Sequence, residues 1–209
     1  MNNVWQEILN LINKSGRNVI IKDGSYQIGK EECDILKIPI DTVLYTVVCN
    51  TNGIIVDNWI YIFGQEGVEN HGIRYYNNNP TYEKNTNGLF IVSSDIVGGL
   101  YAININRYAN GVNLIWYFAP DTLEWECINM KYNEFIAWTL QGNIDDFYST
   151  MRWKNWKQDC VDISMNYAML IYPFLWAKEC DIENASKKVV PLDEIIALNF
   201  HYKNEFVKF

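Results

Sequence analysis

Apolar residues recur along the chain with two different periods, and the change of period divides it into parts. Near the start, Trp5, Ile8, Leu9 and Ile12 are spaced i, i+3, i+4 and i+7. This spacing places them on one face of a helix, which Gly16 is suited to end. The first element predicted is therefore an amphipathic helix that docks on the rest of the protein.

Short β-prone runs bounded by turn residues follow as far as residue 128. Segments 42–49 and 54–56 are expected to pair as a hairpin, because Asn52-Gly53 between them tolerates the positive φ angles of a tight turn. The middle of the chain is thus predicted to be an antiparallel meander. Its other strands are expected at residues 19–21, 59–63, 89–92, 100–105, 114–119 and 123–128.

Residues 64–88 interrupt this series: they are polar, rich in Asn, Gly and Tyr, and without a clear period. Such composition favours a long loop. After residue 128 the helical period returns. We expect a helix capped by Asn133 and ended by Gly142, a second helix from near Asp145, and a last helix opened by Pro191.

Strands grouped in the middle with helices at both ends indicate the α+β class rather than alternating α/β. We expect one domain over residues 1–209, with a central, mostly antiparallel sheet flanked by N- and C-terminal helices. Residues 167–176 are interpreted as a buried strand or a turn-rich segment. No internal repeat or linker divides the chain.

Charge narrows the choice of partners. Hydrophobic residues make up 49% and charged residues 20% of the chain, which is ordinary for a globular protein. The formal net charge is −8 and the isoelectric point is near 4.8. Such a charge repels nucleic acid and anionic membrane surfaces and attracts basic proteins. A basic protein is therefore an expected partner, although the same charge also serves ordinary solubility.

The compartment is expected to be the cytoplasm. The first 17 residues have no basic leader before their apolar positions, unlike a signal peptide. The longest apolar run, residues 168–177, is too short to span a bilayer and contains Pro173. Five scattered cysteines without C-x-x-C spacing are typical of reduced, buried thiols. A soluble cytoplasmic protein is the simplest interpretation.

Motifs for catalysis or cofactor binding are not assembled in the sequence, and no cofactor is expected. The two histidines, His71 and His201, lie outside any G-x-S-x-G or H-E-x-x-H pattern. Residues 24–30 match the glycine and lysine spacing of a phosphate loop, but Glu31 follows where a Ser or Thr should hold magnesium. A carboxylate there would repel phosphate, so a plain turn is favoured.

The densest polar and aromatic signal is residues 118–126, FAPDTLEWE. Alternation on a strand puts Glu124 and Glu126 on one face and Trp125 on the other. With Asp121 nearby, these carboxylates suit cation binding or acid/base chemistry. They suit equally well a solvated face above a buried Trp125, and this second interpretation is favoured.

Six segments, in order, resemble a bacterial family catalogued as a domain of unknown function. They are TNGIIVDNWIYIFG, SSDIVGGLYAIN, WYFAPDTLEWE, the run from YNEFIAW to DDFYSTMRWKNW, YPFLW and VVPLDEI. Together they cover most of the chain after about residue 43. The chain departs from the family by lacking a glycine just before Trp59 and by having Ile105-Asn106 in a glycine-rich stretch, so local turn geometry is expected to differ there.

That family in turn looks like the SUKH superfamily, whose members have an α+β fold and often serve as immunity proteins against bacterial toxins. The similarity lies in the N-terminal tryptophan helix, the NG dipeptide, the GG-containing strand, and the strand, turn, strand, helix order ending at Phe135. The resemblance implies a SUKH-like fold and a protein toxin as partner. It implies no catalytic residues.

The leading hypothesis is a non-enzymatic protein-binding module, an immunity protein that neutralises a basic protein toxin. Recognition is expected at exposed acidic and aromatic residues. The candidate partner-binding residues are Asp57, Trp59, Asp95, Asp121, Glu124 and Glu126. Two alternatives stay open: a small enzyme that uses these carboxylates with or without a metal ion, and a housekeeping adaptor. Carboxylates converging in a pocket favour the enzyme, whereas dispersed carboxylates around an exposed aromatic patch favour binding.

Overall fold

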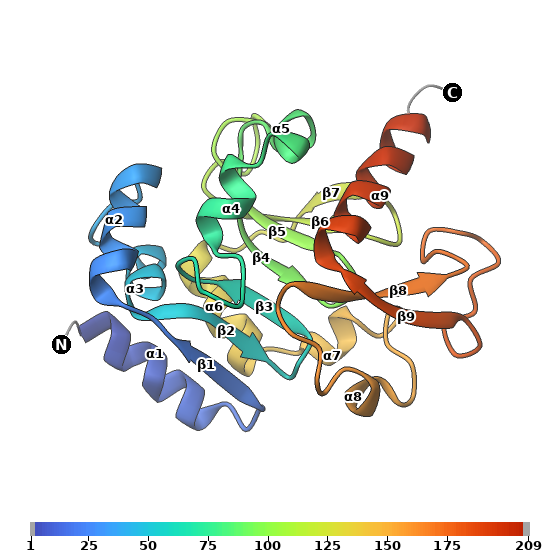
Figure 1. Ribbon diagram of the computed structural model, residues 1–209, viewed down its shortest axis with the longest axis horizontal. Helices are drawn as coiled ribbons and strands as arrows, with labels where there is room; N and C mark the ends of the chain where they lie inside the picture. The colour runs from blue at the N-terminus through green and yellow to red at the C-terminus, as the bar shows by residue number, and fades with distance from the viewer. Residues whose placement is uncertain (1–2, 207–209) are drawn as a thin grey trace.

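A single meandering sheet organises the molecule in the computed structural model, which describes residues 3–206 (Figure 1). Its seven strands lie in sequence order, and every neighbouring pair is antiparallel. They are β1 (Val19–Asp23), β2 (Thr51–Val56), β3 (Ile60–Phe63), β4 (Leu89–Asp95), β5 (Leu100–Asn104), β6 (Ile115–Ala119) and β7 (Glu124–Cys127). The predicted α+β class with a central antiparallel sheet is confirmed.

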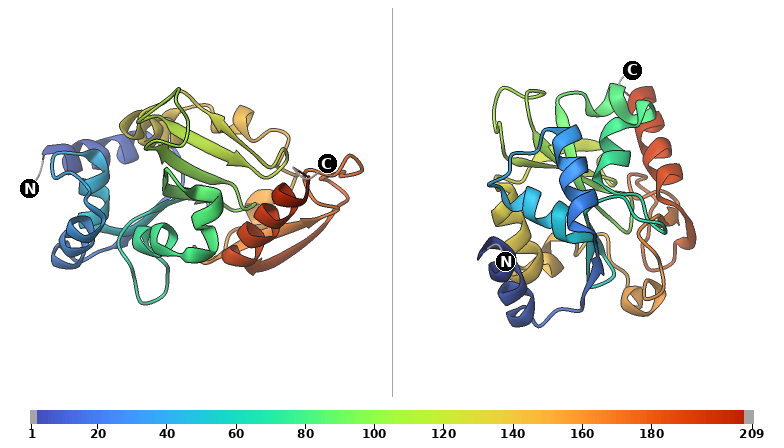
Figure 2. Two further views of the ribbon diagram at one scale, coloured as in Figure 1. Left: turned by 90° about the horizontal axis from the view of Figure 1, so that it is seen from above. Right: turned by 60° about the vertical axis from the view of Figure 1, so that its left-hand side comes forward.

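Helices flank this sheet at both ends of the chain, as predicted. In the described residues they are α1 (Asn3–Lys14), α2 (Tyr26–Leu36), α3 (Val43–Asn50), α4 (Ile73–Asn78), α5 (Pro80–Thr86), α6 (Tyr132–Gln141), α7 (Ile144–Phe147), α8 (Trp156–Asp159) and α9 (Leu192–Phe206). α1, α3 and α6 pack against one another, whereas α4 packs on β4. Figure 2 shows α6 and α4 on opposite sides of the sheet.

A second, two-stranded sheet pairs β8 (Tyr167–Tyr172) with β9 (Ser186–Pro191) and packs against α9. Pro191 is the last residue of β9, so the final helix begins one residue after it. The Met169 amide donates to the Ile96 carbonyl, 2.6 Å away, and joins the small sheet to the turn after β4. Buried hydrophobic side chains form one cluster that extends from Ile8 to Phe200.

The hairpin expected around Asn52-Gly53 is wrong. Residues 43–50 are the buried helix α3, which begins where Thr42 Oγ1 accepts the Tyr45 amide at 3.1 Å. An apolar run of this length fits a buried helix and a buried strand equally well, so its period did not decide between them. Gly53 lies inside β2, where a Cβ atom would sit 2.5 Å from Cε of Met165. The glycine therefore serves close packing rather than a turn.

The hairpin turn forms instead at Asp57-Asn58, between β2 and β3. Both residues have positive φ, 54° and 52°, as the two central residues of a type I′ turn require. Residues 64–88, expected to be a loop, contain the short helices α4 and α5. Asn79 caps α5 by accepting the Thr81 amide at 3.0 Å, and Pro80 starts it. These helices are too short to show a period in the sequence.

The glycine-rich segment near residue 24 is a turn into α2. The Ser25 amide donates to Gln65 Oε1 at 2.8 Å, so it is not free to hold a phosphate. Gly29 lies inside α2 and faces α3, where a Cβ atom would be 2.4 Å from the Val48 carbonyl oxygen. Both features are explained by packing. Among residues 3–206, no helix is long and apolar enough to cross a membrane.

Candidate functional site

The predicted partner-binding residues lie at or near one end of the strands. In an antiparallel meander, every second turn lies at the same end of the sheet. Asp57 is in the β2–β3 turn, Asp95 ends β4, and Asp121 is in the β6–β7 turn. Their environments differ. Asp57 accepts Arg17 Nη1 at 2.8 Å and the Asn18 amide at 3.0 Å. It is therefore already paired.

Trp59 was expected to be exposed, and this expectation is wrong. Its side chain has no exposed area. Its ring packs edge-on against Tyr148 and Trp156, with centroids 5.3 and 5.0 Å away. α7 and α8 cover this part of the sheet edge, which alternation within β3 did not reveal. Trp59 belongs to the core, and no partner reaches it in this structure.

Asp95 is also fully buried, at the centre of a group of tyrosines. Its Oδ1 accepts the amides of Val97 and Gly99 at 3.0 and 2.8 Å. Its Oδ2 accepts the hydroxyls of Tyr117 and Tyr148 at 2.7 and 3.1 Å. Burial raises the pKa of Asp95, although these hydrogen bonds oppose the rise. With four donors around it and no access to solvent, this carboxylate holds the β4–β5 turn.

Arg152 lies beside this group and is held mainly by aromatic rings. Its guanidinium carbon is 4.0 Å from the ring centroid of Trp156 and 4.6 Å from that of Trp59. Nη1 donates to Asp145, while Nε and Nη2 are buried without a hydrogen-bond partner among the described residues. Burial lowers the pKa of this arginine. The arrangement is a packed cation rather than an open binding group.

The β6–β7 turn carries the acidic segment singled out in the sequence. Trp125 is buried and the carboxylates of Glu124 and Glu126 are exposed, as alternation predicted. Glu124 forms an ion pair with Lys203 at 2.7 Å. Asp121 Oδ1 is buried and has no hydrogen-bond partner within residues 3–206. Burial raises the pKa of Asp121, and the charge of Glu126 adds to the rise. These carboxylates do not line one pocket with Asp95 or Asp57.

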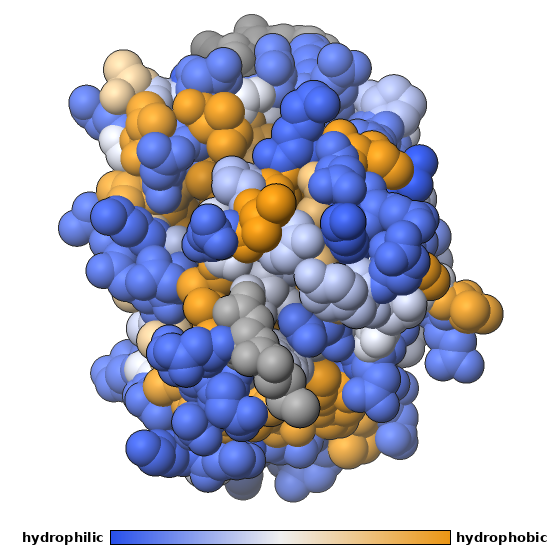
Figure 3. Space-filling model, turned by 90° about the vertical axis from the view of Figure 1, so that its left-hand side faces the viewer, coloured by the Kyte–Doolittle hydropathy of each residue, from blue (hydrophilic) through white to orange (hydrophobic). Residues whose placement is uncertain are grey.

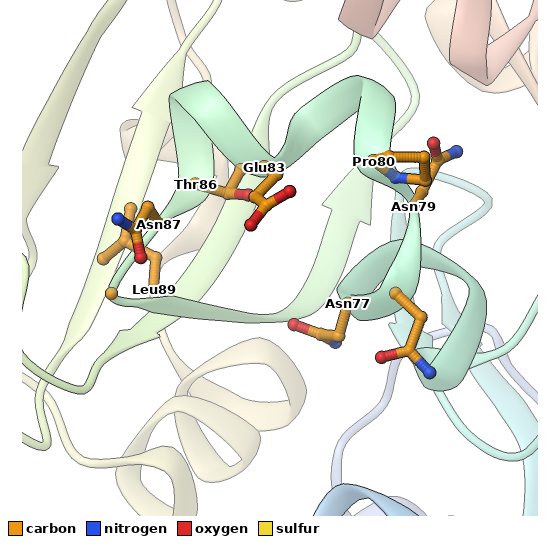
Figure 4. A pocket seen from close by; sticks show the side chains of 9 residues that line it. Asn77, Asn79, Pro80, Glu83, Thr86, Asn87 and Leu89 are labelled. Atoms are coloured by element: carbon orange, nitrogen blue, oxygen red, sulfur yellow. The ribbon is translucent and has the colours of Figure 1, made fainter.

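Two adjoining hollows flank the junction of α4 and α5. One, of about 430 Å³, is lined mostly by amide and hydroxyl side chains, and Figure 4 shows the Glu83 carboxylate directed into it. Asn77 in its wall is fully committed, because its side chain bonds Ile73 and both backbone groups of Ile91. The other, of about 490 Å³, contains Glu66, Arg74 and Tyr75. Sequence reasoning missed both hollows, which lie in the segment expected to be a loop.

His71 adjoins the second hollow, in the connection between β3 and α4. Its Nδ1 is 3.2 Å from Glu66 Oε1, and its ring stacks on Tyr75 with centroids 3.7 Å apart. The Tyr75 hydroxyl donates to Asp193 at 2.5 Å, which raises the pKa of Tyr75 to about 12. Tyr82 donates to the other oxygen of Asp193. Among the described residues, no Ser or Thr hydroxyl and no Cys thiol is hydrogen-bonded to His71, which bonds Glu66 and, through its amide, Asn166. The histidine ties the connection together.

Four exposed apolar side chains gather at a third place, around the loop 161–164. One hollow of about 420 Å³ contains Val161, Tyr167 and Val189, and a second of about 210 Å³ contains Val161 and Ile20. Val161 is 54% exposed, Tyr167 and Val189 are 45% each, and Ile20 is 39%. Ile20 and Ile55, which pair across β1 and β2, both line the second hollow, so it adjoins the main sheet.

Carboxylates surround these apolar side chains. Asp159 and Asp162 line the first hollow, and Asp162 and Glu69 line the second, which also contains one cation, Lys22. We call this region, formed by Ile20, Glu69, Asp159, Val161, Asp162, Tyr167 and Val189, the acid-rimmed surface. Its members come from distant parts of the sequence. Only knowledge of the topology could have gathered them.

A second apolar area lies on α2, where Ile28 and Ile35 are exposed two helical turns apart. Figure 3 views this end of the molecule and shows orange side chains in separate groups among blue ones. Lys30 and Glu31 stand between the two isoleucines in the helix. Because opposite charges alternate there, this area favours neither a basic nor an acidic partner.

Metal binding finds no ready site in the part of the chain that the structure covers. Among residues 3–206, no three His, Cys, Asp or Glu side chains lie close enough together to hold a metal ion. The carboxylates named in the sequence analysis are thus either buried with hydrogen-bond donors or dispersed over the surface. They do not form the convergent pocket that would favour carboxylate chemistry.

Comparison with known proteins places the chain among bacterial relatives. It is 34% identical over 117 residues to the putative uncharacterized protein YbfG of Escherichia coli K12, covering 56% of this chain and 53% of that protein. It is 28% identical over 193 residues to an uncharacterized protein of Haemophilus influenzae, covering 90% of this chain and 84% of the relative. The family model described as protein of unknown function DUF2625 matches residues 1–195. The chain therefore belongs to the DUF2625 family.

Proposed function

We propose that the protein is a non-enzymatic binding module that recognises a basic protein, and that it neutralises a bacterial toxin in this way. The observation on which the proposal rests is the acid-rimmed surface. Four apolar side chains there stay accessible although the chain buries most others of their kind. Exposed apolar groups enclosed by polar residues are typical of protein interaction sites.

Charge supports a basic partner. The surface contains Glu69, Asp159 and Asp162 against the single cation Lys22, and the whole chain has a net charge of −8. Opposite charges speed the encounter of two proteins, and desolvated aromatic or aliphatic side chains then hold the complex. Tyr167 and Val161 are suited to the second task because they are large, apolar and only partly covered.

The similarity to the SUKH superfamily supports the immunity role as an analogy. Fold analogy alone does not establish function. The proposal therefore depends on whether this surface binds a toxin. Asp57 lies next to the acid-rimmed surface, because its neighbour Asn58 lines the smaller hollow. Trp59 and Asp95 are buried and stabilise the fold beneath.

The test is co-expression with the toxin encoded beside this chain, with bacterial survival and co-purification as readouts. We expect the unmodified protein to protect the cells and to form a complex with the toxin. Val161→Asp should abolish both effects, because it places a charge in the centre of the apolar area. Raising the salt concentration should slow association more than it changes dissociation.

A matched control is Ile105→Asp. Ile105 is 49% exposed, but it follows β5 and lies outside the acid-rimmed surface. This variant should protect as well as the unmodified protein. If the unmodified chain neither protects nor binds, the immunity role is rejected. Turnover of a small molecule that requires Asp121 or Glu124 would replace it with the enzyme, and binding to a non-toxic protein would indicate an adaptor.

A further inference from the structure

The connection between β3 and α4 presents an aliphatic side chain at its tip. Val68 is fully exposed, more so than any other large hydrophobic residue in the described part of the chain. Figure 2 shows this connection projecting from the body of the molecule in its left panel. Glu66 and Glu69 lie on either side of the valine in the sequence. A valine in this position has no role in the core of its own chain.

The connection is closed on itself by polar contacts. The Gly67 amide donates to the Asn70 carbonyl at 3.0 Å. Glu66 spans its base, since Oε2 accepts the Gly72 amide at 2.9 Å and Oε1 lies 3.2 Å from His71 Nδ1. Five residues around Val68 are thus held by one short set of bonds. Val68 itself takes part in none of them.

Further hydrogen bonds attach the connection to three other segments. Glu32 Oε1 in α2 accepts the Glu66 amide at 2.9 Å, and the Asn52 carbonyl in β2 accepts Asn70 Nδ2 at 2.8 Å. Asn166 bonds twice, accepting the His71 amide at 2.8 Å and donating to the Glu69 carbonyl at 2.9 Å. A protruding residue on a loop held at so many points is pre-organised, and binding it costs little conformational entropy.

The tip continues the acid-rimmed surface. Glu69 and Asn70 line the same hollow as Ile20 and Val161, so a protein seated on that surface also meets Val68. The Glu69 carboxylate has no hydrogen-bond or ion-pair partner in residues 3–206. It is therefore free to meet a cation of the bound protein.

We propose that Val68 is the anchor of this interface: it enters an apolar pocket of the basic partner, and Glu69 pairs with a Lys or Arg at the rim of that pocket. This inference rests on the proposed binding function. It adds the prediction that the partner has an apolar pocket that receives Val68. The acid-rimmed surface on this chain is shallow by comparison. Anchors of this kind dominate the affinity of many complexes.

The experiment measures the dissociation constant of the purified complex with the toxin encoded beside this chain. Val68→Ala should weaken binding about tenfold and Val68→Asp at least about a hundredfold. Val112→Asp is the matched control, since Val112 is an exposed valine of the β5–β6 connection, 46% accessible. It should change the constant less than about twofold. Circular dichroism should show the same fold for all three variants.

The outcomes separate the two proposals. If the toxin binds the unmodified chain and Val161→Asp removes binding while Val68→Asp does not, the anchor is rejected and the proposed function stands. If Val68→Asp and Val112→Asp weaken binding equally, the anchor is also rejected. If the unmodified chain does not bind the toxin, the proposed function is rejected and the anchor with it. Asn166→Ala should weaken binding while the chain stays folded by circular dichroism, because it removes two hydrogen bonds that hold the loop presenting Val68.

Discussion

The buried group around Asp95 and the acid-rimmed surface lie on the same molecule with opposite arrangements of polarity. Asp95 is a charged residue taken out of water and surrounded by donors, two amides and two tyrosine hydroxyls. The acid-rimmed surface leaves apolar side chains exposed to water, with the carboxylates of Glu69, Asp159 and Asp162 around them, of which Asp159 accepts the Trp153 indole at 2.6 Å. The first arrangement is internally satisfied, and the second is the one that we propose to bind another protein.

The comparison shows which polar residues in this fold indicate function. Asp95 and Trp59 were both candidate partner-binding residues in the sequence, but each is buried among aromatic side chains. In the structure that setting fixes turns and packing. The residues that form the acid-rimmed surface are instead ordinary in type and come from distant parts of the sequence, such as Ile20, Glu69 and Val189.

The largest effect is expected for Trp125, which is a buried residue of the core. Trp125→Ala should lower the free energy of unfolding by about 3 to 5 kcal/mol, because it empties a buried aromatic site next to Phe118. Glu124→Gln should cost about 0.5 kcal/mol or less, since its ion pair with Lys203 is exposed on the carboxylate side. Urea denaturation measures both. The reverse ranking would mean that the carboxylate face is the structural one.

Asp95→Ala should follow, with a loss of about 3 kcal/mol, because it leaves four buried donors without an acceptor. The matched variant Asp162→Ala removes a carboxylate from the acid-rimmed surface and should change stability by about 0.5 kcal/mol or less. Urea denaturation measures the free energy of unfolding of both variants, provided that its dependence on urea concentration has the same slope in each. Equal losses would show that Asp162 has a structural role, and the contrast between the two regions would be wrong.

Much of the fold could be predicted because its strands are short, rich in β-branched and aromatic residues, and separated by Gly, Pro or Asn. β3 to β7 appear at their expected positions. α1 forms where the spacing of apolar residues predicted a helix. The predictions were wrong where local patterns were ambiguous. The apolar run before Thr51 forms α3, and the segment after Phe63 forms two helices too short to show a period.

The candidate site was less accessible to sequence reasoning. Alternation correctly placed Trp125 inside and Glu124 outside, because both lie on one strand. Trp59 is buried by α7 and α8, nearly a hundred positions away in sequence, which no local pattern reports. The acid-rimmed surface joins residue 20 to residue 189. Its only sequence signal was the excess of negative charge.

A smaller effect is expected for Arg152. Unlike Asp95, it is a buried charge whose hydrogen bonding is incomplete. Arg152→Ala should destabilise by about 2 kcal/mol through lost packing between Trp59 and Trp156. Arg152→Met keeps much of that volume and removes two buried unpaired donors, so it should change stability by less than about 1 kcal/mol or raise it. Thermal unfolding of both variants is the measurement. A loss for Met as large as for Ala would show that the charge itself stabilises the fold.

The smallest effect concerns Glu32, which accepts the Glu66 amide and so helps to hold the connection that presents Val68. Burial raises the pKa of Glu32 above its ordinary value of 4.5, and the charge of Glu66 adds to the rise. The folded state therefore binds the proton more tightly than the unfolded state, and the stability due to protonated Glu32 is lost as the pH rises from 4.5 through the raised pKa. Glu32→Gln stays neutral, so its stability relative to the unmodified protein should increase over that interval. Urea titrations at several pH values measure this difference. A difference that stays constant with pH would mean that Glu32 is ionised as readily in the folded chain as in the unfolded one. In that case the bond to the Glu66 amide would balance the effect of burial.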